Sequence, residues 1–448
     1  MNLAELRARI EKGEIDTVIV AVPDVFGRLV GKRFTAPFFL QSVAEHGTHG
    51  CNYLLTVNIE MDPMDGFKLA NWESGFGDFE MRPDNETIRV LPWQPGAALV
   101  ICDFARDKGD LVLEAPRSLL RQQVEAIGKA GFVCKVASEL EFYLFNNSYP
   151  DAFANGYRNL TPSSDYRIDY HTMQPARDEN LFRAARNMMC AADVPVESSK
   201  GEWGRGQHEI NFIYNEPLPV ADMHVVFKQG IKEIAAQQDR SITFMAKPSM
   251  TEAGSSCHIH CSLWRDGQNA FWEPAAKRES RLFRQFLGGL LKYSPELCYF
   301  LAPTINAYKR YQPGSWAPTK MAWSHDNRTV GFRVVGHGNG FRIENRMPGA
   351  DANPYLAFAA TIAAGMAGVR ENLDCGDDYR GNAYLDHSLR ALPASLSVAV
   401  ELLRGSALAK TAFGEDVVEF YAHTGKLEME AFQNSVTDWE KNRYFERI

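Results

Sequence analysis

The sequence predicts an α+β protein in which a small strand-rich N-terminal part precedes a larger part of alternating strands and helices. Residues 17–34 read as two strands around a turn, and mixed strand and loop continue to about residue 104. A helix then opens at Pro116 and carries apolar residues at helical spacing as far as Ile127. The charged stretch 103–110 between the two patterns predicts a boundary between domains at 1–104 and 105–448.

The later elements follow in order. Strand-like alternation recurs in residues 136–145, around Glu209, in 254–263 and in 341–346. Long helices are predicted over residues 178–193 and from about 222 to 238. Residues 355–369 are uncharged and rich in Ala and Gly, which predicts a buried core helix. From Pro393 onward the chain reads as half-polar helix packed on the surface.

Composition limits the class of protein. The 448 residues carry 48 Lys and Arg against 56 Asp and Glu, a net charge of −8, which disfavours a general nucleic-acid binder. Apolar runs fall short of the roughly 20 residues that span a membrane, and the N-terminus has no apolar signal core. The eight cysteines are scattered without a CxxC pair, as in a protein with free thiols. We therefore expect a cytoplasmic protein.

Acidic residues inside apolar strand sequence give the strongest functional signal. Alternation in 136–145 puts Glu139 and Glu141 on one strand face, where two like charges need either solvent or a cation between them. For this pair alone, a solvated edge strand explains the pattern equally well. Glu202 begins a Gly-rich loop, and Glu209 lies in the strand-like run that follows. Taken alone, this segment is explained equally well as a charged loop.

Two further strands add ligand types. His258 and His260 share a strand face, although hydrogen-bonded core histidines are the usual explanation. Glu344 lies between Arg342 and Arg346, which alternatively reads as a surface ladder of ion pairs. Oxygen-rich sets of this kind suit Mg²⁺ or Mn²⁺ better than zinc. Several arginines also fall close together in the sequence: Arg310, Arg328, Arg333, Arg342 and Arg346.

Together these residues predict a metal-dependent enzyme that handles phosphate groups. Arginine forks bind phosphate oxygens, and divalent ions with arginines are the usual means of phosphoryl transfer. The sequence contains neither GxxxxGK[ST] nor GxGxxG, so the common nucleotide-binding loops are excluded.

The motifs SELEFYLF, GQHEINF, GSSCHIHCSLW, NRTVGFR and FRIENRMPGADANPYLAFAA occur in an order that resembles the glutamine synthetase family over nearly the whole chain. The resemblance is strongest to its γ-glutamyl-amine (γ-glutamylpolyamine-type) ligases. It implies a small N-terminal β-grasp-like domain, then a catalytic domain with a curved antiparallel sheet, an open barrel flanked by helices. It also implies ATP as a cosubstrate, two or more Mg²⁺ or Mn²⁺ ions per site, and a homo-oligomer, commonly a dodecamer of two stacked hexameric rings.

The resemblance also assigns roles by position. One metal ion is implied at Glu141, Glu202 and Glu209, and a second at Glu139, His258 and Glu344. ATP binding is implied for Glu197, His260, Ser262, Arg333 and Arg342, and glutamate binding for Gly254, Arg310 and Arg346. Arg328 is implied to steady the transferring phosphate. Asp24, in the N-terminal turn, is implied to reach the site of a neighbouring subunit and hold the incoming amine.

Three departures from the family pattern concern the substrate end. The flap glutamate of ammonium-using members is here Trp316, which cannot act as a base but can wall an organic amine. A glutamate-contacting asparagine is replaced by Ala253. The His-rich run before the loop glutamate is replaced by residues 198–201, SSKG, and a nucleotide-side lysine by Asn339.

We therefore expect a ligase that joins glutamate to an organic amine through γ-glutamyl phosphate. Three alternatives remain at this point. Trp316 can be a packing residue while another carboxylate, such as Glu73 or Asp78, serves ammonia in a glutamine synthetase. The chain can be a catalytically silent relative with a structural role in an oligomer. It can also be a guanidino kinase of the phosphagen type, whose catalytic domain is related in fold.

Overall fold

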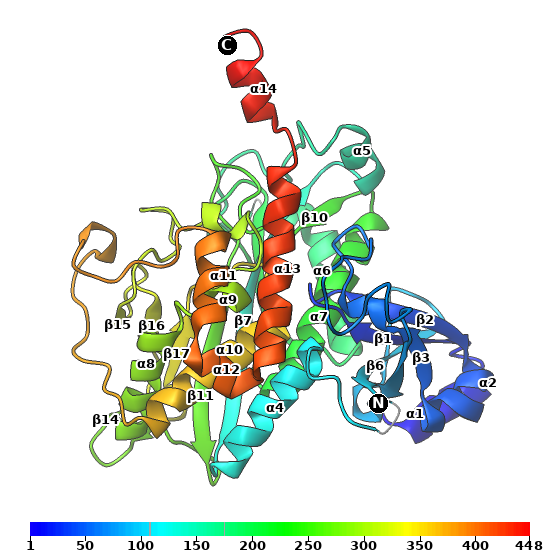
Figure 1. Ribbon diagram of the computed structural model, residues 1–448. Coiled ribbons are helices and arrows are strands. Elements are labelled where there is room, and N and C mark those ends of the chain that lie inside the picture. Colours follow the sequence, from blue (N-terminus) through cyan, green and yellow to red (C-terminus); the bar gives the residue numbers. More distant parts are fainter. Residues whose placement is uncertain (107–108, 174) are drawn as a thin grey trace.

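The protein is built from two main β-sheets with helices packed around them, a mixed α+β architecture (Figure 1). The computed structural model describes residues 1–106, 109–173 and 175–448. The smaller sheet lies in the N-terminal part of the chain, coloured blue in Figure 1, and the larger sheet lies in the rest. The predicted fold class is thereby confirmed.

The smaller sheet has six strands in the order β2-β1-β6-β4-β3, with β5 also paired to β6. The predicted hairpin is confirmed as β1 (Thr17–Pro23) and β2 (Leu29–Thr35), which pair antiparallel, while β1 runs parallel to β6. Gly27, in the turn, has a φ of 76°, which favours glycine. The remaining strands are β3 (Thr48–Cys51), β4 (Asp78–Pro83), β5 (Arg89–Val90) and β6 (Ala97–Ala105). The domain boundary after residue 104 stays a prediction.

The larger sheet has nine strands and carries the predicted site. Its main order is β15-β16-β17-β11-β7-β9-β8, with β10 paired to β7 and β12 to β11. All pairs are antiparallel except β15 with β16. The strands are β7 (Val133–Phe145), β8 (Val196–Gly201), β9 (Gln207–Phe212), β10 (Ser241–Thr243), β11 (Cys257–Arg265), β12 (Gln268–Asn269), β15 (Trp323–His325), β16 (Phe332–Val335) and β17 (Arg342–Asn345). A separate short hairpin joins β13 (Trp272–Glu273) and β14 (Arg278–Glu279).

The helices fall close to their predicted places. The first three are α1 (Leu3–Glu11), α2 (Ala36–Phe38) and α3 (Ala44–His46). In the larger part they are α4 (Pro116–Lys129), α5 (Tyr149–Ala154), α6 (Glu179–Ala191), α7 (Pro217–Ala236), α8 (Arg281–Tyr293), α9 (Cys298–Leu301), α10 (Pro354–Arg370), α11 (Leu396–Gly405), α12 (Ala407–Phe413), α13 (Glu415–Gln433) and α14 (Asp438–Tyr444). Helix α7 begins five residues before the predicted start because Pro217 and Pro219 suit its first turn.

Two features hold this arrangement together. Helix α10 is buried along almost its whole length, as its uncharged sequence predicts, and packs against α4, α7 and α8. Arg117 of α4 binds Asp222 of α7 through two hydrogen bonds and also pairs with Asp103 of β6. Removing one partner of such a buried pair typically costs about 3–5 kcal/mol, so this contact fixes the two sheets relative to each other.

The C-terminal helix stands apart from the body. Helix α14, coloured red, projects beyond α13 at the top of Figure 1. It and the chain end expose Trp439, Phe445 and Ile448. Within the described part of the chain, no helix is both long and apolar enough to cross a membrane.

Candidate active site

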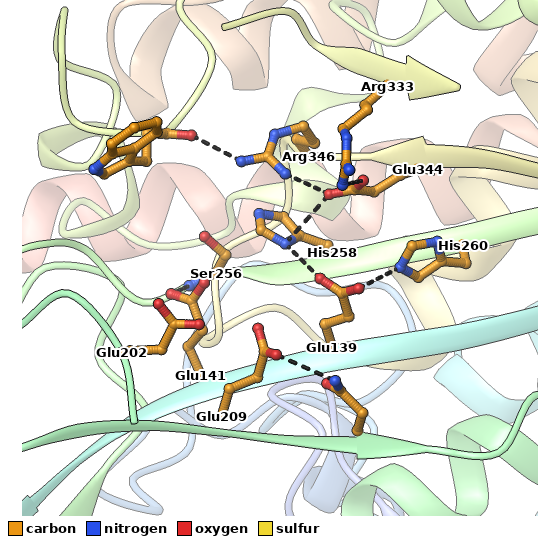
Figure 2. Close-up of polar contacts among 12 residues, drawn as sticks. Glu139, Glu141, Glu202, Glu209, Ser256, His258, His260, Arg333, Glu344 and Arg346 are labelled. Carbon is orange, nitrogen blue, oxygen red and sulfur yellow. Dashed lines mark hydrogen bonds and ion pairs between the residues drawn. The ribbon is translucent and has the colours of Figure 1, made fainter. Parts of the chain in front are cut away.

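The register of the larger sheet brings the predicted acidic residues and histidines to one face. Glu139 and Glu141 of β7 alternate with Leu140, which is fully buried on the opposite face. Glu139 lies opposite His258 of β11, and Glu141 lies opposite Glu209 of β9. Paired residues share a face of the sheet, so these four side chains converge, as Figure 2 shows.

The same register extends to the arginines. Glu344 of β17 lies opposite both His260 of β11 and Arg333 of β16. Glu202 comes from the loop between β8 and β9 and reaches the same place (Figure 2). All six side chains predicted to hold metal ions therefore meet in one region, although they come from five separate segments of the chain.

The first group is entirely acidic. Glu141, Glu202 and Glu209 each offer an oxygen within 4.8 Å of the others. Burial, followed by the charge of Glu202, raises the pKa of Glu141 to about 8, and burial with the neighbouring carboxylates also raises the pKa of Glu209. Backbone N–H of Ser256 donates to Glu141 at 2.8 Å, which fixes the orientation of that carboxylate. Three crowded carboxylates of this kind are stabilised by a divalent cation.

The second group joins Glu139 and Glu209 to His258, again within 4.8 Å. His258 Nδ1 lies 3.0 Å from Glu139, and His260 Nε2 lies 2.7 Å from its other oxygen. Burial, followed by the charge of Arg346, lowers the pKa of His258 to about 4, so its imidazole is neutral and able to bind a metal ion. Glu209 belongs to both groups.

Glu344, the third predicted member of this set, is engaged differently. It lies 3.6 Å from His258 Nδ1, but its carboxylate is bound by the guanidinium groups of Arg333, at 2.8 Å, and Arg346. Although burial raises the pKa of Glu344, the charge of Arg346 and of the nearby histidines lowers it to about 2. It therefore adjoins the second group as a permanently charged carboxylate.

These groups line a cavity of about 370 Å³, which we call the carboxylate cavity. Its residues are Glu139, Glu141, Asp169, Tyr170, Ser198, Lys200, Glu202, Trp203, Gln207, Glu209, Asn211, Ala253, Gly254, Ser256, His258, Ser315, Trp316, Arg328, Arg333 and Arg346. Its volume falls in the range of small-molecule sites, about 300–1,000 Å³. Five carboxylates and four basic groups meet there, which suits anionic substrates together with cations.

A second cavity of about 320 Å³ adjoins it, and Glu139 lines both. We call it the His260 cavity; of the predicted ATP residues it contains Glu197, His260, Ser262 and Arg342, and it also contains Asn339. Arg342 Nε donates to His260 Nδ1 at 3.0 Å, which leaves the Nε2 hydrogen for Glu139. Arg333 lies in the carboxylate cavity instead.

The residues predicted to bind the substrate glutamate have different positions: two line the carboxylate cavity, and one supports its neighbours from the protein interior. Gly254 and Arg346 line the carboxylate cavity. Arg310 lines neither cavity: it is 1% exposed and donates to the carbonyls of Met347 and Arg346 and to Ser256. A Cβ at Gly254 would lie 2.7 Å from Arg310 Cγ, so a glycine there lets the two segments pack.

Asp24 lies in the N-terminal turn and lines neither cavity. Its buried carboxylate accepts hydrogen bonds from backbone N–H of Phe26 and Arg28, at 2.9 and 2.8 Å, and from Arg28 Nε at 2.6 Å. Glu73 and Asp78, the alternative carboxylates for ammonia, also lie outside the lining of the carboxylate cavity.

Trp316 lines the cavity at the flap, with a φ of 66°, and its carbonyl accepts from Arg346 at 3.2 Å. The structure adds aromatic neighbours that the sequence did not single out. Trp203 lies edge-to-face against Trp316, with ring centroids 5.7 Å apart, and Tyr170 lines the same cavity. Trp203 directly follows Glu202, which was a usable signal, whereas Tyr170 lies in a long irregular stretch that carries none.

Comparison with known proteins identifies the family of the chain. The family described as glutamine synthetase, catalytic domain, matches residues 113–444. γ-Glutamylethanolamide synthetase GlnA4 of Streptomyces coelicolor is 49% identical, covering 100% of this chain and 96% of that protein. Glutamate–isopropylamine ligase of a Pseudomonas species is 36% identical, covering 100% and 98%.

A solved structure of GmaS in complex with ADP has a TM-score of 0.85 and 26% identity, covering 98% of this chain and 99% of that one. The fold agrees with the family that the sequence relatives indicate. The chain therefore belongs to the glutamine synthetase family, within its branch of γ-glutamyl-amine ligases.

Proposed function

We propose that this protein is an ATP-dependent ligase that joins the γ-carboxyl group of glutamate to a small organic amine. The observation that carries the proposal is one cavity in which buried carboxylates and arginines face an aromatic wall, with Trp316 at the flap. Relatives named as a γ-glutamylethanolamide synthetase and a glutamate–isopropylamine ligase support an organic acceptor.

The residues present fit two divalent ions. Glu141, Glu202 and Glu209 would hold one; burial, followed by the charge of neighbouring carboxylates, raises the pKa of Glu141 and of Glu209, which a cation would offset. Glu139 and His258 would hold the other, with Glu209 and Glu344 adjoining. Carboxylates with one imidazole favour Mg²⁺ or Mn²⁺. When bound, such ions neutralise the charge of the nucleotide phosphates.

Different residues of the chain would then bind the nucleotide and face the phosphoryl group that is transferred. Glu197, His260, Ser262 and Arg342 would bind ATP in the His260 cavity, and Arg328 and Arg333 would face the transferring phosphoryl group. A γ-carboxylate oxygen of glutamate attacks the terminal phosphorus, and the bond to ADP breaks. The amine nitrogen attacks the acyl carbon, phosphate leaves, and the nitrogen loses a proton.

Glutamate would be bound by Arg346 and against the backbone at Gly254. Arg310 would act as a positioning residue, because its guanidinium group already binds the carbonyls of Arg346 and Met347. This differs from the direct contact that the family resemblance implies for Arg310.

Assembly completes the proposal. The family resemblance assigns Asp24 to the amine site of a neighbouring subunit; within this chain its carboxylate is fully buried and bound by Phe26 and Arg28, so we propose that this turn contributes to the contact between subunits. The projecting helix α14 exposes Trp439 and Phe445, which supports association with other copies, and we propose a dodecamer of two stacked hexameric rings. We place the enzyme in the cytoplasm, because its eight cysteines form no disulfide within the described residues.

Phosphate release from ATP and glutamate with a panel of amines tests this function. We expect small organic amines to outperform ammonia, with a γ-glutamylamide and ADP as products. Ammonia outperforming every organic amine would make the protein a glutamine synthetase. A stable N-phosphate product would indicate a guanidino kinase, and no ATP turnover with Mg²⁺ or Mn²⁺ would indicate a silent relative.

A further inference from the structure

Two of the three aromatic side chains that line the carboxylate cavity and form its aromatic wall contact cations of the chain itself, and one of these cations, Arg167, lies outside the lining. Three aromatic side chains line this cavity: Tyr170, Trp203 and Trp316. The guanidinium carbon of Arg167 lies 4.6 Å from the ring centroid of Trp203. Lys200 Nζ lies 4.5 Å from the ring centroid of Tyr170. Two of the three rings therefore carry a cation–π contact before any substrate binds.

These contacts change what the wall can recognise. An aromatic ring attracts an ammonium group when its face is free. Here an ammonium group on Trp203 would lie close to Arg167, for which the described residues supply no ion-pair partner, whereas the charge of Lys200 on Tyr170 is already paired with Glu202 and Asp169. At Trp203, repulsion from the guanidinium group of Arg167 opposes the attraction of the ring. The wall therefore suits an uncharged group.

The position of the wall relates it to the acceptor. The other side chains of the cavity are mostly charged or polar, so Tyr170, Trp203 and Trp316 supply its large apolar surface. Trp316 contacts Trp203, and its carbonyl accepts from Arg346, the residue proposed to bind glutamate. The nitrogen of an acceptor amine has to reach the activated carboxyl group, so the rest of the molecule lies along this wall.

We propose that Arg167 is a specificity-determining residue, which restricts the acceptor to monoamines with a neutral tail by excluding a second ammonium group. The inference rests on the proposed function, since it concerns the acceptor of that ligation. Hydroxyl or alkyl tails are accepted on this basis, whereas diamines and polyamines are rejected. The γ-glutamylpolyamine-type activity suggested by the sequence motifs is therefore not expected.

A matched pair of substrates tests the proposal: 4-amino-1-butanol and 1,4-diaminobutane have the same length and differ in the charge of the far end. One unit charge about 8 Å away, at an effective dielectric constant of about 30, shifts binding by roughly tenfold. We expect the unmodified enzyme to prefer the amino alcohol by about tenfold in kcat/KM. Arg167→Gln should reduce this preference to about threefold or less.

Two controls separate charge from structure. Arg167→Lys keeps the charge and should keep the preference. Arg177→Gln removes an exposed arginine that pairs with Asp165, outside the lining of the carboxylate cavity, and should also keep the preference. The ratio of kcat/KM for the two substrates on one enzyme is independent of the fraction of protein that is folded.

The outcomes distinguish this inference from the proposed function. Formation of γ-glutamyl hydroxamate from hydroxylamine, ATP and glutamate reports the acyl phosphate whatever the amine tail. Without hydroxamate, the proposed function fails. Hydroxamate formed with equal use of both substrates by the unmodified enzyme, or with a preference unchanged in Arg167→Gln, overturns the role of Arg167.

Discussion

The two ends of the carboxylate cavity are built in different ways. The end that we propose for the phosphates, here called the phosphate end, stands on paired strands, where the register of β7, β9, β11 and β17 places every predicted metal ligand except Glu202, which lies in the loop between β8 and β9. The end that we propose for the amine, here called the amine end, consists of loop residues: Tyr170, Trp203 and Trp316 are 70%, 37% and 46% exposed. Side chains on paired strands are fixed by the core beneath them, whereas loop side chains depend on few contacts.

This difference explains how one fold can keep its chemistry and change its acceptor. A strand residue that holds an acidic group cannot move without shifting its neighbours across the sheet. A loop residue can be exchanged with little effect on the core. Substitutions at the two ends should therefore differ both in the parameter that they change and in the size of the change.

The largest effect is expected for Glu209→Gln at the phosphate end. This residue belongs to both carboxylate groups, and loss of even an indirect metal contact costs about 10–100-fold, so phosphate release should fall by at least about a hundredfold. Calorimetry with Mn²⁺ and an assay of phosphate release measure the two losses. The metal-free variant should be no less stable than the unmodified protein, because burial and the neighbouring carboxylates raise the pKa of Glu209 and so disfavour its charged form, which an uncharged amide replaces.

The matched control is Glu216→Gln. Glu216 precedes α7 and pairs with Lys135 at 3.5 Å, outside the carboxylate cavity. Its removal should leave Mn²⁺ affinity unchanged. Full phosphate release by Glu209→Gln would show that the two carboxylate groups do not hold the ions.

The next largest effect is expected for the Mn²⁺ affinity, which should change by about tenfold per pH unit. Burial and Glu202 raise the pKa of Glu141 to about 8, so below that pH the metal-free site holds a proton that Mn²⁺ must displace. Affinity should therefore rise with pH, by up to about tenfold per unit for one released proton, and level off above about pH 8. Calorimetry in buffers of different ionisation enthalpy counts the protons. A pH-independent affinity would contradict the protonated carboxylate.

Trp316→Ala is expected to change KM by about tenfold for the amine alone. Loss of the ring removes apolar contact with the amine, so KM for the amine should rise by about tenfold while KM for ATP stays within about twofold. Trp439→Ala, on the exposed helix α14, is the matched control for loss of an indole. An unchanged KM for the amine would reduce Trp316 to a packing residue.

The smallest effect is expected for Tyr170→Ala, on the free energy of unfolding. Tyr170 is largely exposed, so its loss should change the free energy of unfolding by less than about 0.5 kcal/mol. Leu140→Ala, fully buried between the two glutamates of β7, should cost about 2–5 kcal/mol. Denaturant titration of both variants compares the two ends, and an equal loss would show that the loops are part of the core.

The sequence predicted the phosphate end better than the amine end, for a physical reason. Strand alternation alone placed Glu139 with Glu141 and His258 with His260, because a period of two leaves each residue one face. Nothing in a single strand states which strands pair, so the sharing of Glu209 between both groups needed the register. The part of Arg310 in supporting its neighbours, and the cation on Trp203, depend on side-chain packing that no local pattern encodes.

Glu139 gives the two cavities a common wall. One of its oxygens accepts from His260, which lines the His260 cavity, and the other from His258, in the carboxylate cavity. A rotation of this one side chain changes hydrogen bonds in both compartments at once. If the nucleotide and the acid bind as proposed, both would adjoin this carboxylate, and filling one cavity would alter hydrogen bonds in the other without any movement of the backbone.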